Sequence, residues 1–167
     1  MLSKVITVTA AAALSVMFVI GSVKAETRGK LIVNELSGKC LDVPGISNLA
    51  PGTPLQIYDC EVSGFEVNGK ESDQFWVFDR KGQIRNTLSG MCIDIAGTEK
   101  DSLIQIEACD AANPAQVWIF HENGFIENEA TGKCINVAGI AATATGTPLQ
   151  LSECETGNPQ TDQRWRA

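Results

Sequence analysis

Histidine and metal-binding motifs are scarce in this chain of 167 residues. It has one histidine, His121, and no Cys-x-x-Cys pair, so the ordinary ligand set of a zinc site is missing. A single histidine also leaves little material for a catalytic nucleophile, base and orienting group. His121 ends a predicted strand beside Glu122, and neighbouring strand residues face opposite ways. We interpret it as a surface residue and expect neither a metal nor a cofactor.

Positive charge is scarce as well. The chain has 13 Lys and Arg residues against 20 Asp and Glu, and two of the lysines lie in the first 25 residues, which hold no acid. The remainder therefore carries a net charge of −9. Such an acidic surface favours solubility and disfavours a nucleic acid or an anionic membrane as partner.

Long apolar segments are absent after the N-terminus. Lys4 precedes a run of 16 apolar or small residues, Val5 to Ile20, and small residues follow around Ala25. A membrane anchor is the alternative to a signal peptide, but this run is shorter than the roughly 20 residues that cross a bilayer. We predict a signal peptide over 1–25, a secreted or periplasmic product, and no membrane span after cleavage. Residues 26–167 then suffice for one domain.

Six cysteines remain in this exported chain, an even number that indicates disulfides. Sequence alone permits about 15 connectivities, but the cysteines alternate between close and wider spacings. Nearest-neighbour pairing is therefore predicted, and each local loop contributes roughly 3 kcal/mol on the chain-entropy model. The predicted pairs are Cys40 with Cys60, Cys92 with Cys109, and Cys134 with Cys154.

The chain repeats three times. Each unit contains Ile-x-Asn, a hydroxyl residue with glycine, a cysteine, a second cysteine, and then Gln-x-Trp. The units cover about 29–80, 81–122 and 123–167. Their matched segments are short, rich in β-branched residues and bounded by turn residues, without a helical stripe. Four segments in each unit predict an all-β domain of about twelve strands.

The Gln-x-Trp segments have a structural interpretation. Residues two apart in a strand share a face, so glutamine and tryptophan point the same way. Three equivalent tryptophans, Trp76, Trp118 and Trp165, can then meet in one core. A buried glutamine amide beside each needs partners, and its donor and acceptor ends can both bind neighbouring backbone.

Three units of Cys-x-Asp or Cys-x-Asn, a second cysteine and Gln-x-Trp resemble the ricin-B-type lectin family over the whole chain after the signal. The resemblance implies a β-trefoil of three pseudo-symmetric lobes, each with a local disulfide. It also implies a sugar site built from an aspartate two residues after the first cysteine, an aromatic two before the second, and Asn-Gln opening Gln-x-Trp. Carboxylate and amide groups bind sugar hydroxyls, and an aromatic ring packs against the sugar's C–H face.

The first lobe matches this pattern best. The implied site residues are Asp42, Gln56, Tyr58, Asp73 and Gln74. Asp73 departs from the pattern, because the family has asparagine there and a carboxylate cannot donate. Two carboxylates near one site also repel unless donors separate them. Sugar preference is therefore expected to differ from the family's usual galactose-type choice, and the alternative is that Asp42 and Tyr58 are surface remnants.

The other two lobes depart further. In the second, Asp94 remains, but Glu107 replaces the aromatic and Ala115 the asparagine. In the third, Asn136 replaces the aspartate and Ser152 the aromatic, while Asp162 and Gln163 remain. We predict that neither binds sugar. The first lobe also has extra chain, with Gln74 14 positions after Cys60, and this insert around Phe65 either walls the sugar pocket or is an indifferent surface loop.

These observations predict a secreted module that binds glycans or glycoconjugates and is not an enzyme. Paired carboxylates for glycoside hydrolysis remain an open alternative, although the obvious acids belong to the binding pattern. A second alternative is a receptor-binding or delivery subunit that joins a toxin or enzyme partner and does not bind sugar independently. A protease-inhibitor trefoil is the weaker third option.

Overall fold

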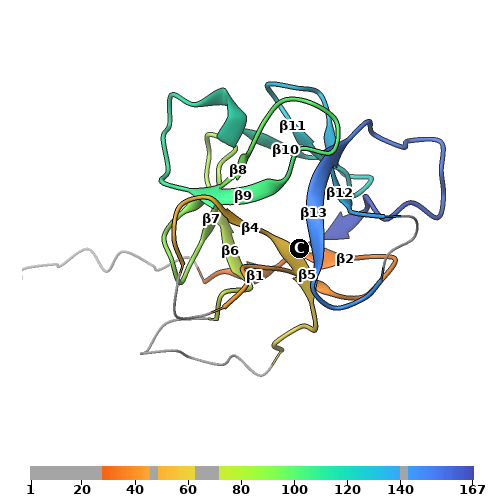
Figure 1. Cartoon of the computed structure of the whole chain (residues 1–167), viewed down its shortest axis with the longest axis horizontal. Coiled ribbons are helices and arrows are strands. Elements are labelled where there is room, and N and C mark those ends of the chain that lie inside the picture. Colours follow the sequence, from red (N-terminus) through yellow and green to blue (C-terminus); the bar gives the residue numbers. More distant parts are fainter. Residues whose placement is uncertain (1–27, 46–48, 63–71, 140–142) are drawn as a thin grey trace, which may run out of the picture.

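A computed structural model describes residues 28–45, 49–62, 72–139 and 143–167. In this part of the chain fourteen short strands and one 3₁₀ helix are arranged as three lobes around a common centre (Figure 1). The first lobe contains Lys30–Leu31 (β1), Val33–Asn34 (β2), Cys40–Asp42 (β3), Thr53–Pro54 (β4), Gln56–Tyr58 (β5) and Phe75–Phe78 (β6). The second contains Ile84–Asn86 (β7), Cys92–Ile95 (β8), Ile104–Glu107 (β9), Pro114–Gln116 (η1) and Trp118–Phe120 (β10). The third contains Ile126–Asn128 (β11), Cys134–Val137 (β12), Thr147–Ser152 (β13) and Trp165–Arg166 (β14).

The fourteen strands correspond to the twelve predicted segments, because two segments are interrupted. Only Ile32 separates β1 from β2, and only Leu55 separates β4 from β5. Each interruption is a change of partner: β1 pairs with β6 but β2 with β3 and β14, while β4 pairs with β9 but β5 with β3 and β13. The prediction of an all-β trefoil is confirmed.

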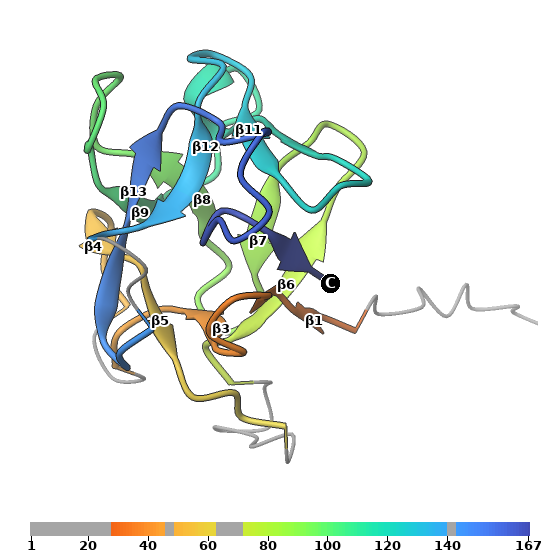
Figure 2. The same cartoon turned by 90° about the vertical axis from the view of Figure 1, so that its right-hand side faces the viewer.

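Pairing of the last strand with an early one closes the domain. Trp165 of β14 lies opposite Asn34 of β2, and Figure 2 shows the C-terminal strand beside the first lobe. Pairing of β14 with β2 therefore holds the third lobe against the first. Within the described residues no helix is long and apolar enough to cross a membrane. The predicted signal peptide and the insert around Phe65 both lie outside those residues.

The tryptophans of the three Gln-x-Trp segments lie in the core, as predicted. Trp76 and Trp165 are almost completely buried, and Trp118 is 4% exposed. Each indole Nε1 donates to a backbone carbonyl at 3.0 to 3.3 Å. The acceptor is always the residue after the first cysteine of the same lobe: Leu41, Ile93 or Ile135. The polar edge of each ring is thereby satisfied without leaving the core.

The asparagine of each Ile-x-Asn segment joins one lobe to the preceding one. Asn86 Nδ2 donates to the carbonyl of Asp73 at 2.7 Å, and Asn128 Nδ2 to that of Ala115 at 2.8 Å. Asn34 completes the ring by donating to Asp162 at 2.6 Å. All three asparagines are fully buried, so these bonds satisfy buried backbone at the lobe boundaries.

All three predicted disulfides form. Cys40 bonds to Cys60, Cys92 to Cys109 and Cys134 to Cys154, with sequence separations of 20, 17 and 20. In each lobe the bridge ties the start of the second strand segment to the end of the third. It therefore anchors the hairpin that carries the implied sugar-binding residues.

Candidate functional site

The first-lobe hairpin of β3 and β5 brings three implied site residues onto one face. Asp42 lies directly opposite Gln56, and Cys40 lies opposite Tyr58. Because strand residues alternate between faces, Leu41 and Ile57 point the other way and are fully buried in the core. This outer face therefore carries the exposed ring of Tyr58 and the amide of Gln56 beside the carboxylate of Asp42, which is 4% exposed.

Two amides hold the Asp42 carboxylate. Gln56 Nε2 donates to Oδ2 at 2.6 Å, and Gln74 Nε2 donates to Oδ1 at 3.0 Å. Burial raises the pKa of Asp42, although both amide bonds oppose this. An ionised carboxylate has about four acceptor positions. About two of these acceptor positions remain after the two amide bonds, which is the number needed to accept hydrogen bonds from two sugar hydroxyls.

Gln74 positions this site from within the core. Its side chain is fully buried. Besides Asp42, its Nε2 donates to the carbonyl of Asp59 at 3.0 Å, and its Oε1 accepts from the amide of Glu61 at 2.8 Å. Both amide hydrogens are thus engaged inside the protein. The structure therefore gives Gln74 the role of orienting Asp42.

Asp73 lies in an acidic environment. It is 4% exposed, and its Oδ1 has no hydrogen-bond partner. Burial, followed by the charges of Asp42 and Glu61, raises the pKa of Asp73 to about 7. A protonated Asp73 carries the donor that the family pattern's asparagine would supply. The contribution of Asp42 and Glu61 to the raised pKa is the repulsion between neighbouring carboxylates that the sequence leads us to expect.

Tyr58 forms the open side of the site. It is 43% exposed, so its ring is accessible to a sugar. The next residue, Asp59, forms an ion pair with Lys39 and accepts from Thr145 Oγ1 at 3.3 Å. The hydrogen bond and charge of Lys39 hold the pKa of Asp59 below its usual value. Contact with Thr145 of the third lobe fixes the end of β5 beyond the aromatic residue.

In the second lobe, the equivalent aspartate accepts three hydrogen bonds from the protein. Asp94 Oδ2 accepts from Gln116 at 2.9 Å and from Asn113 Nδ2 at 3.2 Å, and Oδ1 accepts from the amide of Ile95 at 2.6 Å. Asn113 also caps η1 by accepting from Ala115. Sequence analysis did not identify Asn113, because its distance from Gln-x-Trp differs from that of the family asparagine. Its contact strengthens the case against sugar binding by this lobe.

The third lobe has an open cleft at the equivalent position. A cleft of about 310 Å³ is lined by Asn136, Gln150, Ser152 and Asp162, which correspond to Asp42, Gln56, Tyr58 and Asp73. Glu155 and Asp101 also line it. Burial and the charge of Glu155 raise the pKa of Asp162 to about 6. Sequence analysis, which judged this lobe only by its lost aromatic and aspartate, did not anticipate a cleft here.

Asn136 is oriented differently from Asp42. Its Nδ2 donates to the carbonyl of Val137 at 2.8 Å, and its Oδ1 accepts from Gln163 Nε2 at 3.2 Å. The amide thus uses its donor on the backbone and presents no second carboxylate oxygen to the cleft. The third lobe offers a shaped polar cavity with weaker hydroxyl acceptors and no ring.

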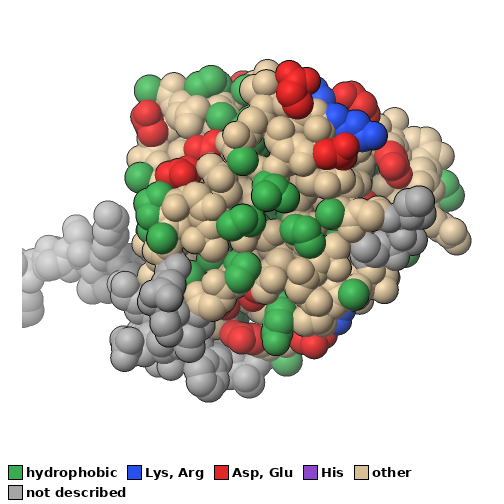
Figure 3. Space-filling view, in the orientation of Figure 1, with side chains coloured by type: hydrophobic (Ala, Val, Ile, Leu, Met, Phe, Trp, Pro, Cys, Tyr) green, Lys and Arg blue, Asp and Glu red, His purple; other side chains and the backbone are tan. Residues whose placement is uncertain are grey.

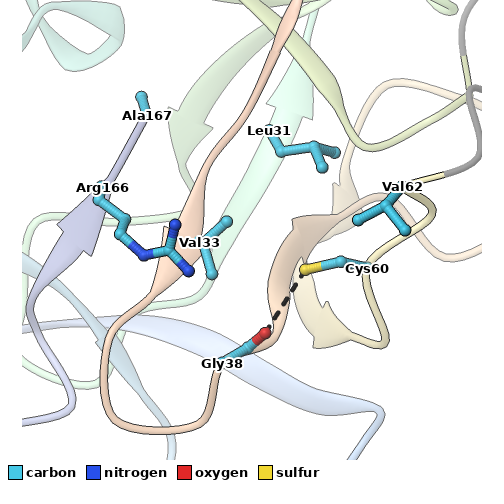
Figure 4. A pocket seen from close by; sticks show the side chains of 7 residues that line it. All are labelled: Leu31, Val33, Gly38, Cys60, Val62, Arg166 and Ala167. Atoms are coloured by element: carbon cyan, nitrogen blue, oxygen red, sulfur yellow. Dashed lines mark hydrogen bonds between the residues drawn. The ribbon is translucent and has the colours of Figure 1, made fainter.

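A second cleft, of about 410 Å³, shares no lining residue with the third-lobe cleft. It is lined by Leu31, Val33, Val62, Arg166 and the backbone of Gly38 beside Cys60 (Figure 4). It carries mostly apolar side chains and one guanidinium, without the carboxylate and amide set. Figure 3 shows one face of the protein, on which hydrophobic side chains are scattered and several Asp and Glu side chains lie near the edge.

Among the described residues, no group of three or more His, Cys, Asp or Glu side chains is arranged to hold a metal ion. His121 contacts Glu127 at 2.8 Å through Nε2. The contact joins the residue after β10 to a residue of β11 and involves none of the implied site residues.

Comparison with known proteins agrees with this arrangement. A 25% identical earthworm R-type lectin half, solved in complex with GalNAc, superposes with a TM-score of 0.64 over 81% of this chain and 94% of that one. The hemolytic lectin CEL-III is 27% identical, with a TM-score of 0.62 over 83% of this chain and 29% of that one. A designed three-fold symmetric protein, ThreeFoil, is 20% identical, with a TM-score of 0.67 over 81% of this chain and 94% of that one.

None of the curated protein sequences is significantly similar to this chain. The family model for the ricin-type β-trefoil lectin domain, however, matches residues 28–166. The chain belongs to the ricin-type β-trefoil lectin domain family.

Proposed function

We propose that this protein is an exported carbohydrate-binding module that recognises galactose-type or related glycans through its first lobe. The observation that carries the proposal is the outer face of the β3–β5 hairpin. There Asp42 lies opposite Gln56 and is held by two amides, while Tyr58 is exposed two residues along the same strand. An oriented acceptor beside an accessible ring is the arrangement that a pyranose requires.

The other lobes support the choice of the first by contrast. In the second lobe, three internal donors bind the carboxylate of Asp94, whereas two bind that of Asp42. In the third, Asn136 and Ser152 provide a weaker acceptor and no ring. The proposed galactose-type preference draws on the earthworm lectin, which was solved with GalNAc. Asp73 gives a reason to expect a preference different from that lectin's.

Export is supported by the N-terminal apolar segment and by the three disulfides, which persist in oxidising compartments. The obvious acids of the first lobe, Asp42 and Asp73, belong to the proposed binding site, and His121 contacts none of the implied site residues. We therefore propose a binding function without catalysis.

A delivery or receptor-binding subunit is the second candidate. The hemolytic lectin, of which this chain spans 29%, is a larger protein that contains the same fold. A trefoil of this kind can thus be one part of a larger protein. Stable co-purification with a larger partner, together with no glycan binding by the isolated chain, would favour this candidate.

Calorimetry against the best ligand from a glycan array tests the first-lobe site. A monosaccharide with about 12 heavy atoms, at roughly −0.3 kcal/mol for each, binds with a millimolar constant. Tyr58→Ala removes the stacking ring and Asp42→Ala the main hydroxyl acceptor, so each is expected to abolish detectable binding. Glu107→Ala and Ser152→Ala are the matched changes in the other lobes and are expected to bind like the unmodified protein.

The contrary result is equally clear. If Tyr58→Ala and Asp42→Ala both bind like the unmodified protein, the first lobe is not the site. Loss of binding on changing Asp162 and Gln150 would then assign it to the third-lobe cleft.

A further inference from the structure

A turn precedes the third strand segment of each lobe, and one of its residues lies against a neighbouring lobe. This residue has a left-handed backbone in all three lobes, and its amide donates at 2.8 Å to a carbonyl of the neighbouring hairpin. Figure 1 shows the third-lobe case, where β13 runs beside β5 of the first lobe. Each hairpin is therefore flanked by a residue that another lobe supplies. The three turn residues are Gly52, Asp101 and Gly146, and the carbonyls belong to Ile106, Leu151 and Ile57, respectively.

Asp101 is the exception among these turn residues. Its φ is 67°, and in the described part of the chain it is the one residue other than glycine with a positive φ. Side chains strain this conformation, although aspartate tolerates it better than most residues. Asp101 Oδ1 accepts from Gln150 Nε2 at 2.9 Å, and Gln150 is the third-lobe equivalent of Gln56. The third-lobe glutamine thus binds a carboxylate that the second lobe supplies, while Asn136 of its own hairpin is held by Gln163.

In the second lobe, the hairpin glutamine also binds an acid beside it. Gln105 Nε2 donates to Glu107 Oε1 at 3.4 Å, and Glu107 stands at the position of the aromatic residue. The turn residue of the neighbouring lobe is close by, since a Cβ at Gly52 would lie 3.7 Å from Glu107 Oε1. The turn residue and the aromatic position therefore flank the glutamine, and an acid at either one binds its amide.

The first lobe has no acid at either flanking position. Tyr58 stands at the aromatic position and Gly146 at the turn. Gln56 Nε2 donates to Asp42 Oδ2 at 2.6 Å, within its own lobe. A Cβ at Gly146 would lie 3.8 Å from Gln56 Oε1, which is ordinary contact. A carboxylate at this turn position would therefore reach the Gln56 amide, as the second-lobe turn reaches the glutamine of the third lobe.

We infer that Gly146, in the third lobe, is a positioning residue of the first-lobe sugar site, because its lack of an acceptor side chain leaves Gln56 bound to Asp42. This inference rests on the proposed sugar site and names a determinant of its affinity that lies in another lobe. Asp101 is the counterpart: its carboxylate holds Gln150 in a lobe for which no sugar site is proposed.

The test is calorimetry with the best ligand from the glycan array at about pH 7, where an introduced aspartate is ionised. Gly146→Asp is expected to weaken binding about fivefold, the effect of losing one hydrogen bond that orients Asp42. Gly146→Ala places a side chain on the same left-handed backbone without an acceptor. It is expected to bind within about twofold of the unmodified protein.

Gly52→Asp is the matched control. It makes the same substitution in the equivalent turn, beside the second-lobe hairpin, and strains the backbone in the same way. Its sugar affinity is expected to stay within about twofold of the unmodified protein, because the turn does not flank Gln56. Equal weakening by Gly52→Asp and Gly146→Asp would show that backbone strain acts on the whole fold, and would overturn the inference.

A double-mutant cycle tests whether the effect passes through Gln56. Gln56→Ala removes the same bond to Asp42 and is expected to weaken binding about fivefold. Gly146→Asp added to Gln56→Ala is expected to weaken binding by less than about twofold further, because the amide to be captured is gone. If the two effects multiply, the new carboxylate acts on the sugar directly and the inference is overturned.

The remaining outcomes separate this inference from the proposed function. No sugar binding by the unmodified protein overturns the proposed function. Binding that is equally tight in Gly146→Asp and Gly146→Ala overturns the inference alone and leaves the sugar site standing. If Gly146→Asp does not fold, Gly146→Asn takes its place, since asparagine tolerates this backbone and its amide oxygen also accepts. It is expected to bind about threefold more weakly than Gly146→Ala, and equal binding by these two variants overturns the inference as well.

Discussion

Gln74 Nε2 lies 3.0 Å from Asp42 Oδ1, so an amide buried in the core orients the carboxylate of the proposed site. The same arrangement recurs between Gln116 and Asp94 at 2.9 Å, where no sugar site is proposed. The bond therefore belongs to the fold, and our proposal gives it a second role in the first lobe, where it leaves two acceptor positions on Asp42.

Gln74→Ala and Gln116→Ala separate the two roles of this amide. Each removes a buried side chain that accepts from a backbone amide and donates to a backbone carbonyl. We expect each to lower the free energy of unfolding by about 2 to 3 kcal/mol, measured by denaturant titration. Sugar binding should weaken in Gln74→Ala alone. Equal weakening in both would mean that binding responds to overall stability and not to the orientation of Asp42.

The raised pKa values predict how stability varies with pH. Asp73 has a folded pKa of about 7 and Asp162 of about 6, both above the ordinary 3.8. The folded state therefore holds protons that the unfolded state releases, so their contribution is fully present below about pH 4 and is lost as pH rises toward 7. The melting temperature is expected to fall across this range, by the equivalent of about 1 to 3 kcal/mol after allowing for solvent screening.

Asp73→Asn with Asp162→Asn provides the control, because an amide does not titrate. The double variant should flatten the profile and be more stable than the unmodified protein at about pH 8. A profile that stays as steep in the variant would show that other groups cause it.

The core and the site are expected to differ in their effect on folding. Trp118→Ala removes a buried aromatic ring and its bond to the carbonyl of Ile93, and should cost about 3 to 5 kcal/mol. Asp42→Ala removes a small side chain that is 4% exposed and leaves two amide donors without this acceptor, and should cost about 1 to 2 kcal/mol. Thermal unfolding measures both. Equal losses would contradict the division between core and binding residues.

Repeat spacing was sufficient to predict about twelve strands, the three disulfides and the tryptophan core, because each depends on residues that recur in step with the strands, and the trefoil followed from the family resemblance. The role of the Ile-x-Asn asparagines was not predicted. Asn86 acts across a lobe boundary, on the backbone of Asp73, and a repeated residue alone does not tell which lobe it contacts. The same limit applies to Asn34 and Asn128.

The site was predictable in part. The facing of Asp42, Gln56 and Tyr58 follows from strand alternation once the hairpin register is known. Asn113, which donates to Asp94, was missed because it begins η1 at a position outside the repeated pattern. The third-lobe cleft was missed because Lys100 and Asp101, on a second-lobe loop, form part of its wall. Such walls depend on contacts between lobes.

The final prediction adds a second sugar site by design. Asn136→Asp with Ser152→Tyr places a carboxylate and a ring at the third-lobe positions of Asp42 and Tyr58, beside a cleft that already exists. Gln163 is in place to orient the new aspartate, as it now contacts Asn136 at 3.2 Å. Calorimetry is expected to show the stoichiometry rising from about one sugar per chain to about two, with each site in the millimolar range.

Glu107→Tyr is the matched change in the second lobe, which already has the aspartate. It restores the ring at the position opposite Cys92, but Asn113, Gln116 and the amide of Ile95 still engage both oxygens of Asp94. This variant is expected to stay at about one sugar per chain, because the acceptor and not the ring is then limiting. A second site in Glu107→Tyr would show that internal donors do not silence Asp94. Failure of the third-lobe variant to gain a site, with its fold intact, would show that an aspartate and a ring beside an open cleft are not enough for binding.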